Sequence, residues 1–405
     1  MRGALRHPQF RLLFWSSLFG DAGYWISFIA LQAEMADITH KSAGWLGVLY
    51  FANFIPMLLF APIAGVVADR RDRRRILITV RLVIAVIGAV LAVLILSGLS
   101  SPGPLLVLAA CLGTTYAFIG PAQSAAIANS VPDADLISAV STAAVGNNLA
   151  RVAGPALAAP VLALGGNGGA FVVYAITSLT VAALLVPVRL RTHLEVHDDQ
   201  GTWSRWVDGL RHARERPPAL AALLTMTVFS IFGGAQAVLY PVFASDVFHR
   251  PTRDFTLIVM ASGIGAVLGA VGNGLRSHVP GLRSALLLLV GFAVATLAFA
   301  SSRQWWLGLA CVVVVGFCYF SMTTALTTLL QHLADDAKRG RIMSLFVVTW
   351  GGIIPVGALA MGAVASTTGA PVAVGAGACV CLVYAVGQLL RLRLRPGQAS
   401  MAPLR

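Results

Sequence analysis

Two ionisable residues, Asp21 and Arg151, stand near the middle of long apolar stretches of the sequence. A charge at the centre of a membrane-spanning helix costs about 2.5 to 3.5 kcal/mol on insertion scales, so such residues usually serve a function. Their similar depth allows an ion pair. We predict that Asp21 binds and releases a proton, with an affinity that changes as Arg151 or water approaches. The alternative is a fixed bond from Asp21 to the backbone or to Arg151 that only orders the helices.

Glu34 lies further along the same stretch as Asp21. We predict that it takes part in proton coupling at the outer rim of a cavity, where it would accept protons or attract cations. A wetted helix end is the alternative. Polar and aromatic side chains at similar depth could line that cavity, because aromatic faces stack on amphipathic molecules. The candidates are Tyr24, Trp25, Phe28, Asn53, Gln123, Asn148, Phe232, Gln236, Tyr240 and Trp350.

The elements that position these side chains must be membrane helices. The chain has 405 residues, of which 58% are hydrophobic and only 11% are charged, against about 25% charged in soluble proteins. Twelve apolar runs are long enough to cross a bilayer, and none shows the alternation of a barrel strand. The predicted spans are 10–36, 43–69, 76–98, 103–128, 139–163, 169–188, 219–245, 254–276, 283–301, 304–331, 341–366 and 371–391.

The basic residues are unevenly distributed among the loops. The chain carries 29 Lys and Arg against 16 Asp and Glu, which gives a formal net charge of +13. One side holds only Lys41, Arg250, Arg253 and Arg303, and apart from Arg151 every other Lys and Arg is assigned to the opposite side. Because cytoplasmic loops keep positive charge, we place both termini in the cytoplasm. The excess charge then indicates contact with anionic lipid, not nucleic acid.

A polar stretch and an internal repeat divide the chain into two halves. The segment 131–135 before the fifth span resembles the segment 333–337 before the eleventh, about half the chain away. We predict an all-α integral membrane protein of two pseudo-symmetric six-helix bundles, over 1–188 and 219–405, the second with a basic cytoplasmic tail. The cytoplasmic linker 189–218 is either a solvated segment or carries an amphipathic surface helix, since Trp203, Trp206 and Leu210 share one helical face.

The loop between the second and third spans reads Gly65-Val-Val-Ala-Asp69-Arg-Arg-Asp-Arg-Arg-Arg75. It resembles the loop signature of the major facilitator superfamily. The resemblance implies a cytoplasmic gate that holds the two halves together, with the Asp69 carboxylate as acceptor and the glycine allowing close packing. Ordinary helix capping is the alternative for the aspartates near the eleventh span. We assign to this gate Gly65, Asp69, Arg73, Arg74, Asp335, Arg339 and Arg341.

Five further segments narrow the resemblance to the enterobactin-exporter and macrolide-efflux branch, over residues 5 to about 390. They are 7–13, 20–25, 120–123, 148–156 and 339–344. The pair Gly154-Pro155 in the fourth of these resembles the antiporter motif of the superfamily, which implies a tight helix interface and a bending point. One departure is the lack of any cation over 111–128, where many drug/proton antiporters carry an arginine.

This resemblance implies a multi-pass exporter of the bacterial plasma membrane that moves amphipathic small molecules, drugs or siderophores, by alternating access and in exchange for protons. No phosphate-binding loop, HExxH or metal-ligand spacing occurs, so we predict no enzyme activity, no cofactor and no metal. The expected partners are the substrate, protons and membrane lipid, with the chain a monomer. The alternatives are a membrane binding or sensor protein without translocation, an ion-independent facilitator, and a lipid exporter.

Overall fold

The computed structural model describes residues 3–190, 216–274, 281–333 and 339–394, and every regular element in these ranges is helical. Asp335 and most of the predicted linker, including the proposed amphipathic helix, lie outside the described residues. The described helices follow the hydrophobic runs closely, because only a helix satisfies all its backbone hydrogen bonds within an apolar segment. The all-helical membrane fold is therefore confirmed.

Five long helices make up most of the first half of the chain. They are α1 (Pro8–Ile38), α2 (Ala43–Arg70), α3 (Arg73–Leu96), α4 (Pro102–Ala128) and α5 (Leu136–Leu185). Short 3-10 turns at Ala4–Arg6 and Asp133–Asp135 precede α1 and α5. Two predicted spans, 139–163 and 169–188, lie in α5, which breaks at Gly166 with φ of 64°. Glycine tolerates this left-handed conformation because it has no Cβ atom.

The helices of the second half are less regular. They are α7 (Pro217–Val228), α8 (Tyr240–Val242), α9 (Phe255–Gly274), α10 (Leu282–Ser301), α11 (Trp305–Leu333), α12 (Arg339–Val347), α13 (Ile354–Thr368) and α14 (Ala370–Leu394). Single π-helical turns at Phe229–Gly233, Phe243–Val247 and Val348–Gly352 interrupt the seventh and eleventh predicted spans. Such turns often accompany functional sites in helices.

Within the described residues, ten helices are long and apolar enough to cross a membrane, and a shorter apolar helix covers Leu136–Asn147. The difference from the twelve predicted spans has two sources. The more polar α1, which carries Asp21 and Glu34, is not among the ten. The two spans that share α5 are counted once, as Ala153–Leu185.

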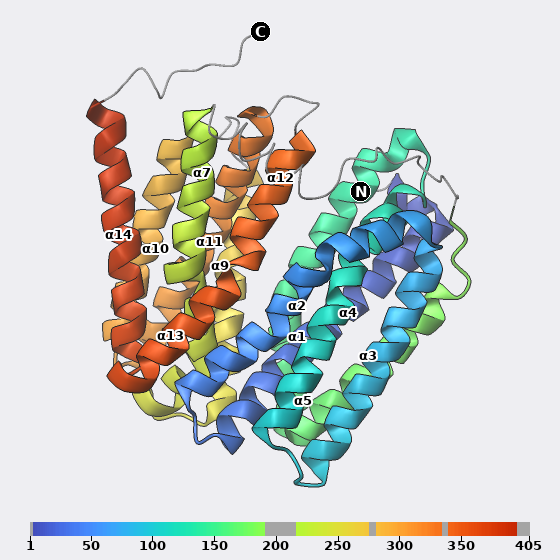
Figure 1. Ribbon diagram of the computed structural model, residues 1–405, viewed down its shortest axis with the longest axis horizontal. Helices are drawn as coiled ribbons and strands as arrows, with labels where there is room; N and C mark the ends of the chain where they lie inside the picture. The colour runs from blue at the N-terminus through green and yellow to red at the C-terminus, as the bar shows by residue number, and fades with distance from the viewer. Residues whose placement is uncertain (1–2, 191–215, 275–280, 334–338, 395–405) are drawn as a thin grey trace. The chain divides into compact units, whose positions relative to one another are not determined.

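The chain forms two compact units (Figure 1). Unit 1 contains Met1–Lys41, Ala52–Asp198 and Thr252–Met260, and unit 2 contains the remaining residues. The units therefore differ from a simple division into halves, because Ser42–Phe51 of α2 groups with unit 2 and the start of α9 groups with unit 1. The division at 1–188 and 219–405 stays a prediction.

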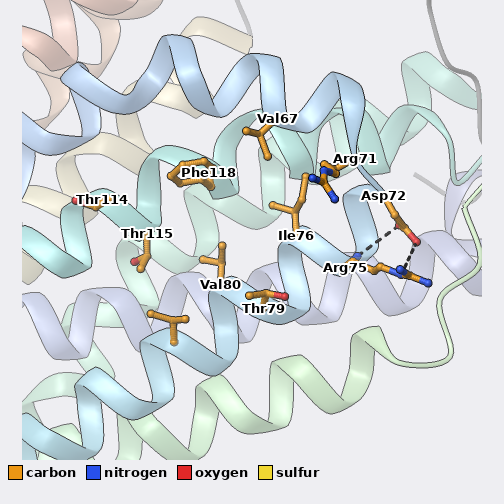
Figure 2. A pocket seen from close by; sticks show the side chains of 11 residues that line it. Val67, Arg71, Asp72, Arg75, Ile76, Thr79, Val80, Thr114, Thr115 and Phe118 are labelled. Carbon is orange, nitrogen blue, oxygen red and sulfur yellow. Dashed lines mark hydrogen bonds and ion pairs between the residues drawn. The ribbon is translucent and has the colours of Figure 1, made fainter.

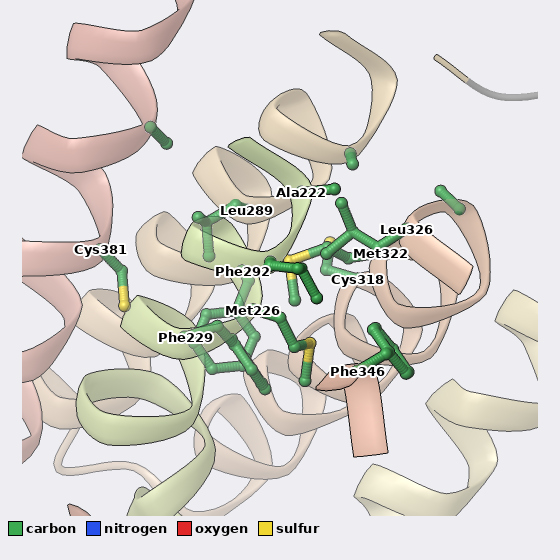
Figure 3. Close-up of a cluster of buried hydrophobic side chains, with 14 of the residues drawn as sticks. Ala222, Met226, Phe229, Leu289, Phe292, Cys318, Met322, Leu326, Phe346 and Cys381 are labelled. Atoms are coloured by element: carbon green, nitrogen blue, oxygen red, sulfur yellow. The ribbon is translucent and has the colours of Figure 1, made fainter. Parts of the chain in front are cut away.

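An apolar cluster forms the core of unit 2, where α7, α10, α11 and α14 meet (Figure 3). Phe229 belongs to this cluster, with its ring stacked on Tyr319 at 5.1 Å between centroids and edge-on to Phe292 at 5.0 Å. Met226, Met322 and Cys318 fill the space around these rings, a use suited to their flexible or small side chains. Close packing of this kind stabilises helix bundles in lipid, where burial of apolar surface adds little.

Small residues bring α1 and α5 of unit 1 close together. A methyl group added at Gly154 would lie 2.8 Å from Cγ of Trp25, at the root of that side chain. At Gly146, an added methyl group would lie 2.8 Å from a ring carbon of Phe14. Gly154 of the Gly154-Pro155 pair thus allows α5 to pack closely against α1 within unit 1.

We expect Gly154→Ala to lower the stability of the purified chain by about 1–3 kcal/mol, because Trp25 cannot rotate away from a methyl group near its own Cγ atom. Thermal unfolding in one detergent measures the change. The control is Gly120→Ala, since no atom lies within 4 Å of the added methyl group in α4. That variant should be neutral or more stable by up to about 1 kcal/mol. Equal unfolding midpoints for both variants would contradict this account of the interface.

Candidate functional site

A buried arginine that the sequence analysis did not single out lies inside unit 1. The side chain of Arg81, on α3, is only 2% exposed. Its guanidinium rests on α1, because a methyl group added at Gly20 would lie 2.6 Å from Cζ and 2.8 Å from Nη1. Nη1 has no hydrogen-bond partner in the structure as described. Burying an unsatisfied charged group is costly, so this arrangement indicates a functional position.

By sequence, Arg81 counts only among the basic residues of the cytoplasmic side, whereas the structure buries it within α3. The residue lies between Val80 and Leu82 within the predicted span 76–98, so its apolar neighbours were a readable signal. A count of charges on each side of the membrane does not consider how far each residue lies inside a helix, so it does not distinguish Arg81 from the loop arginines.

Two tyrosine hydroxyls lie in the same part of unit 1 as this charge. The hydroxyls of Tyr116, on α4, and Tyr174, on α5, are 2.7 Å apart and share a hydrogen bond. The Arg81 charge acts on both of them. The ring of Tyr24 lies edge-on to Tyr116 at 4.5 Å and stacks on Phe28 at 5.8 Å. Four helices thus contribute polar or aromatic groups to one buried cluster.

Asp21 follows Gly20 on α1, so its backbone is next to the position where the Arg81 guanidinium rests. Its side chain is half-buried. The backbone of Arg151 lies in α5, the helix that packs along α1, but the placement of its side chain is outside the described structure. The Asp21–Arg151 ion pair stays a prediction. The same limit applies to the side chains of Asp69, Asn148, Arg339 and Arg341.

Glu34 is buried, with only 7% exposure, so it is not a wetted helix end. Its part in proton coupling stays a prediction. Oε1 accepts a hydrogen bond from Oγ of Ser100 at 2.5 Å, and Oε2 accepts one from Nδ2 of Asn167 at 2.9 Å. Asn167 also donates to Asp37 at 3.2 Å. Asp37, one residue beyond the predicted span, is exposed overall, but partial burial of its carboxyl group is the largest cause that raises its pKa, while the Asn167 hydrogen bond lowers it. Glu34 therefore ties the end of α1 to α5, just after its Gly166 break.

Two residues at the arginine-rich loop between α2 and α3 cap helix ends. Nε of Arg74 donates to the carbonyl oxygen of Leu185 at 3.2 Å, and Nη2 donates to that of Val186, so this side chain covers the C-terminal end of α5. Oδ1 of Asp72 accepts from the backbone N–H of Arg74 at 2.9 Å and so caps α3. At Gly65 an added methyl group would meet no atom within 4 Å, so close packing does not require glycine there. Arg73 is half-buried at the start of α3. The gate itself stays a prediction.

The predicted cavity residues of unit 1 mostly connect its helices. Nε2 of Gln123, on α4, donates to Oγ of Ser17, on α1, at 2.8 Å. Asn53 is buried, and its carbonyl group lies against Gly113, where an added methyl group would be 2.9 Å from the carbonyl carbon. Trp25 packs on Gly154, as described above. Each therefore has a structural contact in its own unit.

The predicted cavity residues of unit 2 lie at or beside its irregular turns. Nε1 of Trp350 donates to the hydroxyl of Tyr319 at 2.9 Å. Gln236 is buried, and its Oε1 has no hydrogen-bond partner in the described part of the chain. Phe232 is partly exposed, whereas Tyr240 is buried edge-on against Phe299 at 6.1 Å. Unit 2 thus holds a buried amide oxygen that a polar ligand or water could satisfy.

A pocket of about 460 Å³ opens among α2, α3 and α4 of unit 1 (Figure 2). Most of its wall is apolar, and charged side chains lie only at the end near the start of α3. Its lining consists of Val67, Arg71, Asp72, Arg75, Ile76, Thr79, Val80, Val83, Thr114, Thr115 and Phe118. Among the described residues, no group of three His, Cys, Asp or Glu could hold a metal ion.

Comparisons with known proteins agree over nearly the whole chain. The family model described as "Transmembrane secretion effector" matches residues 3–405. The Staphyloferrin A transporter of Staphylococcus aureus is 25% identical and aligns over 89% of this chain and 90% of its own length. The Enterobactin exporter EntS of Citrobacter koseri is 26% identical and aligns over 98% of this chain and 96% of its own length. Macrolide efflux protein A of Streptococcus pyogenes is 23% identical and aligns over 84% of this chain and 86% of its own length.

Solved structures of transporters share the fold. A bacterial homologue of the human lysosomal transporter Spinster, in an inward-facing and unoccupied conformation, matches with a TM-score of 0.75 at 14% identity, covering 97% of this chain and 98% of that one. The nucleoside transporter NupG matches with a TM-score of 0.69 at 12% identity, covering 97% of this chain and 100% of that one. At these identities the likeness concerns the fold alone.

We expect Glu34→Gln to lower the stability of the chain by about 1–3 kcal/mol, because an amide cannot accept both hydrogen bonds from Ser100 and Asn167 while it presents its own N–H groups. Thermal unfolding at neutral pH measures the loss. Asp37→Asn is the matched control, since that exposed carboxylate accepts one longer hydrogen bond, and it should change stability less. Equal stability of Glu34→Gln and the unmodified chain would argue against this anchoring role.

Proposed function

Because the chain belongs to the Transmembrane secretion effector family of the major facilitator superfamily, we propose that it is a secondary active exporter of amphipathic small molecules. Drugs or siderophores are the substrate class, and export proceeds by alternating access in exchange for protons. Relatives named as a staphyloferrin A transporter, an enterobactin exporter and a macrolide efflux protein support this substrate class. We place the chain in the bacterial plasma membrane, with both termini in the cytoplasm.

The buried guanidinium of Arg81, which rests against Gly20, the residue before Asp21 on α1, carries the proposal of proton coupling. A cation inside an apolar bundle favours the ionised form of a nearby carboxylate, and removal of water disfavours it. The balance between these two effects changes whenever a helix movement alters the distance between Asp21 and Arg81, or between Asp21 and Arg151. Such a movement would change the proton affinity of Asp21 as the protein changes the side to which it opens.

The geometry around Arg81 suits a movement of this kind. Nη1 has no partner in the described structure, so the guanidinium can move without breaking a hydrogen bond at that atom. The tyrosine hydroxyls of Tyr116 and Tyr174 bond to each other and could accept from the guanidinium in another arrangement. A buried cation with a choice of neighbours is a physical means of binding a proton in one state and releasing it in another.

Proton release on substrate binding tests this function. Purified protein in detergent and weak buffer would receive macrolides, tetracyclines, lipophilic cations or siderophores, and a pH indicator would report released protons. We expect at least one of these ligands to release protons from the unmodified chain. Asp21→Asn should abolish that release. Arg81→Gln should move the release to higher pH, because loss of the cation disfavours the ionised carboxylate.

The control is Arg283→Gln, which removes an exposed arginine at the start of α10 in unit 2. It should leave the pH range of proton release unchanged. Ligand binding without proton release, with equal affinity in Asp21→Asn, would overturn the coupling and favour an ion-independent facilitator. Binding without movement of a labelled ligand across proteoliposomes would favour a binding or sensor protein.

A further inference from the structure

The pocket among α2, α3 and α4 plays no part in the proposed exchange of protons, and its chemistry is divided between two ends. At one end are the guanidinium groups of Arg71 and Arg75, both exposed. Figure 2 shows them beside Asp72, whose Oδ2 lies 3.7 Å from Nε of Arg75. One carboxylate against two arginines leaves net positive charge at this end of the pocket.

The rest of the pocket offers almost nothing that forms hydrogen bonds. The hydroxyl of Thr114 donates to the carbonyl oxygen of Ala110 at 2.9 Å, and the hydroxyl of Thr115 donates to the carbonyl oxygen of Leu112 at 2.6 Å. Both threonines therefore present mainly their methyl groups, alongside the apolar side chains of Val80 and Phe118. Besides the two arginines, a free anion would find only the hydroxyl of Thr79 as a donor in this lining, whereas a hydrocarbon chain fits the apolar wall.

An exposed apolar stripe continues from the pocket along α3. Val83 lines the pocket, and Val86, Val90 and Val93 follow it at helical spacing with exposed fractions of 43%, 64%, 42% and 65%. These positions share one face of the helix. From Arg75 to Val93 the stripe extends about 27 Å at 1.5 Å per residue, which is close to the thickness of the hydrocarbon core.

We propose that this pocket binds an anionic phospholipid. The phosphate group lies between Arg71 and Arg75, and one acyl chain enters the pocket and follows the valine stripe of α3. The charge of the arginines selects a headgroup with net negative charge over a zwitterionic one. The apolar wall distinguishes the lipid from a free phosphate, because both parts of the site are satisfied only by a molecule that is anionic at one end and apolar along its length.

Lipid binding to the purified full-length chain tests the proposal. Phosphatidylglycerol and phosphatidylcholine with the same acyl chains would be titrated in detergent, and native mass spectrometry would count the lipids bound to each chain. We expect phosphatidylglycerol to bind more tightly. Arg71→Gln with Arg75→Gln should weaken it by roughly 5- to 30-fold, since a basic residue near a lipid surface contributes about fivefold. Phosphatidylcholine binding should hardly change.

The matched control is Arg391→Gln with Arg393→Gln, which removes two exposed arginines from the end of α14. It should change phosphatidylglycerol binding less than twofold. Val80→Trp fills the pocket without altering its charge and should weaken both lipids. Equal binding of the two lipids, or an equal loss in the control, would overturn the proposal. Displacement of phosphatidylglycerol by excess glycerol 1-phosphate would identify a free-phosphate site instead.

Discussion

The guanidinium of Arg81 inside an apolar bundle is the constraint on which unit 1 depends. Lipid offers no water to a buried charge, so the protein must provide its surroundings. It does so with the small surface of Gly20 and, nearby, a pair of tyrosine hydroxyls on α4 and α5. The helices that carry these groups must approach closely, which explains why glycines occur where α1 meets α3 and α5.

Polar groups near the ends of the same helices have a different use. Glu34 joins α1 to α5 and to Ser100 in the turn between α3 and α4, and Arg74 covers the last carbonyl groups of α5. Both contacts fix helix ends, where backbone groups would otherwise lack partners. The buried guanidinium of Arg81 differs from these groups, because its Nη1 has no hydrogen-bond partner in the described part of the chain.

The sequence predicted the spans well and the polar contacts poorly, for physical reasons. Hydrophobic runs set the length of a membrane helix, so most boundaries lie within a few residues of the structure. Two predicted spans continue into one another as α5, with a break only at Gly166, and hydrophobic runs do not reveal such a break. A single π-helical turn such as Phe229–Gly233 does not change the hydrophobic pattern enough to be predicted from the sequence. The partners of Glu34 are more than 60 positions away along the chain, and only the fold brings them together.

The two faces of α3 explain why arginines a few positions apart serve different purposes. Buried residues such as Leu77, Arg81 and Ile84 recur at spacings of three and four, and Arg74 lies one step before them on the same face. Arg75 begins the opposite face, which continues through the exposed valines. The 3.6-residue period therefore directs Arg74 and Arg81 to the bundle and Arg75 away from it. A run of basic residues at a membrane boundary is thus divided by helix geometry into groups that stabilise the bundle and groups that remain available to lipid.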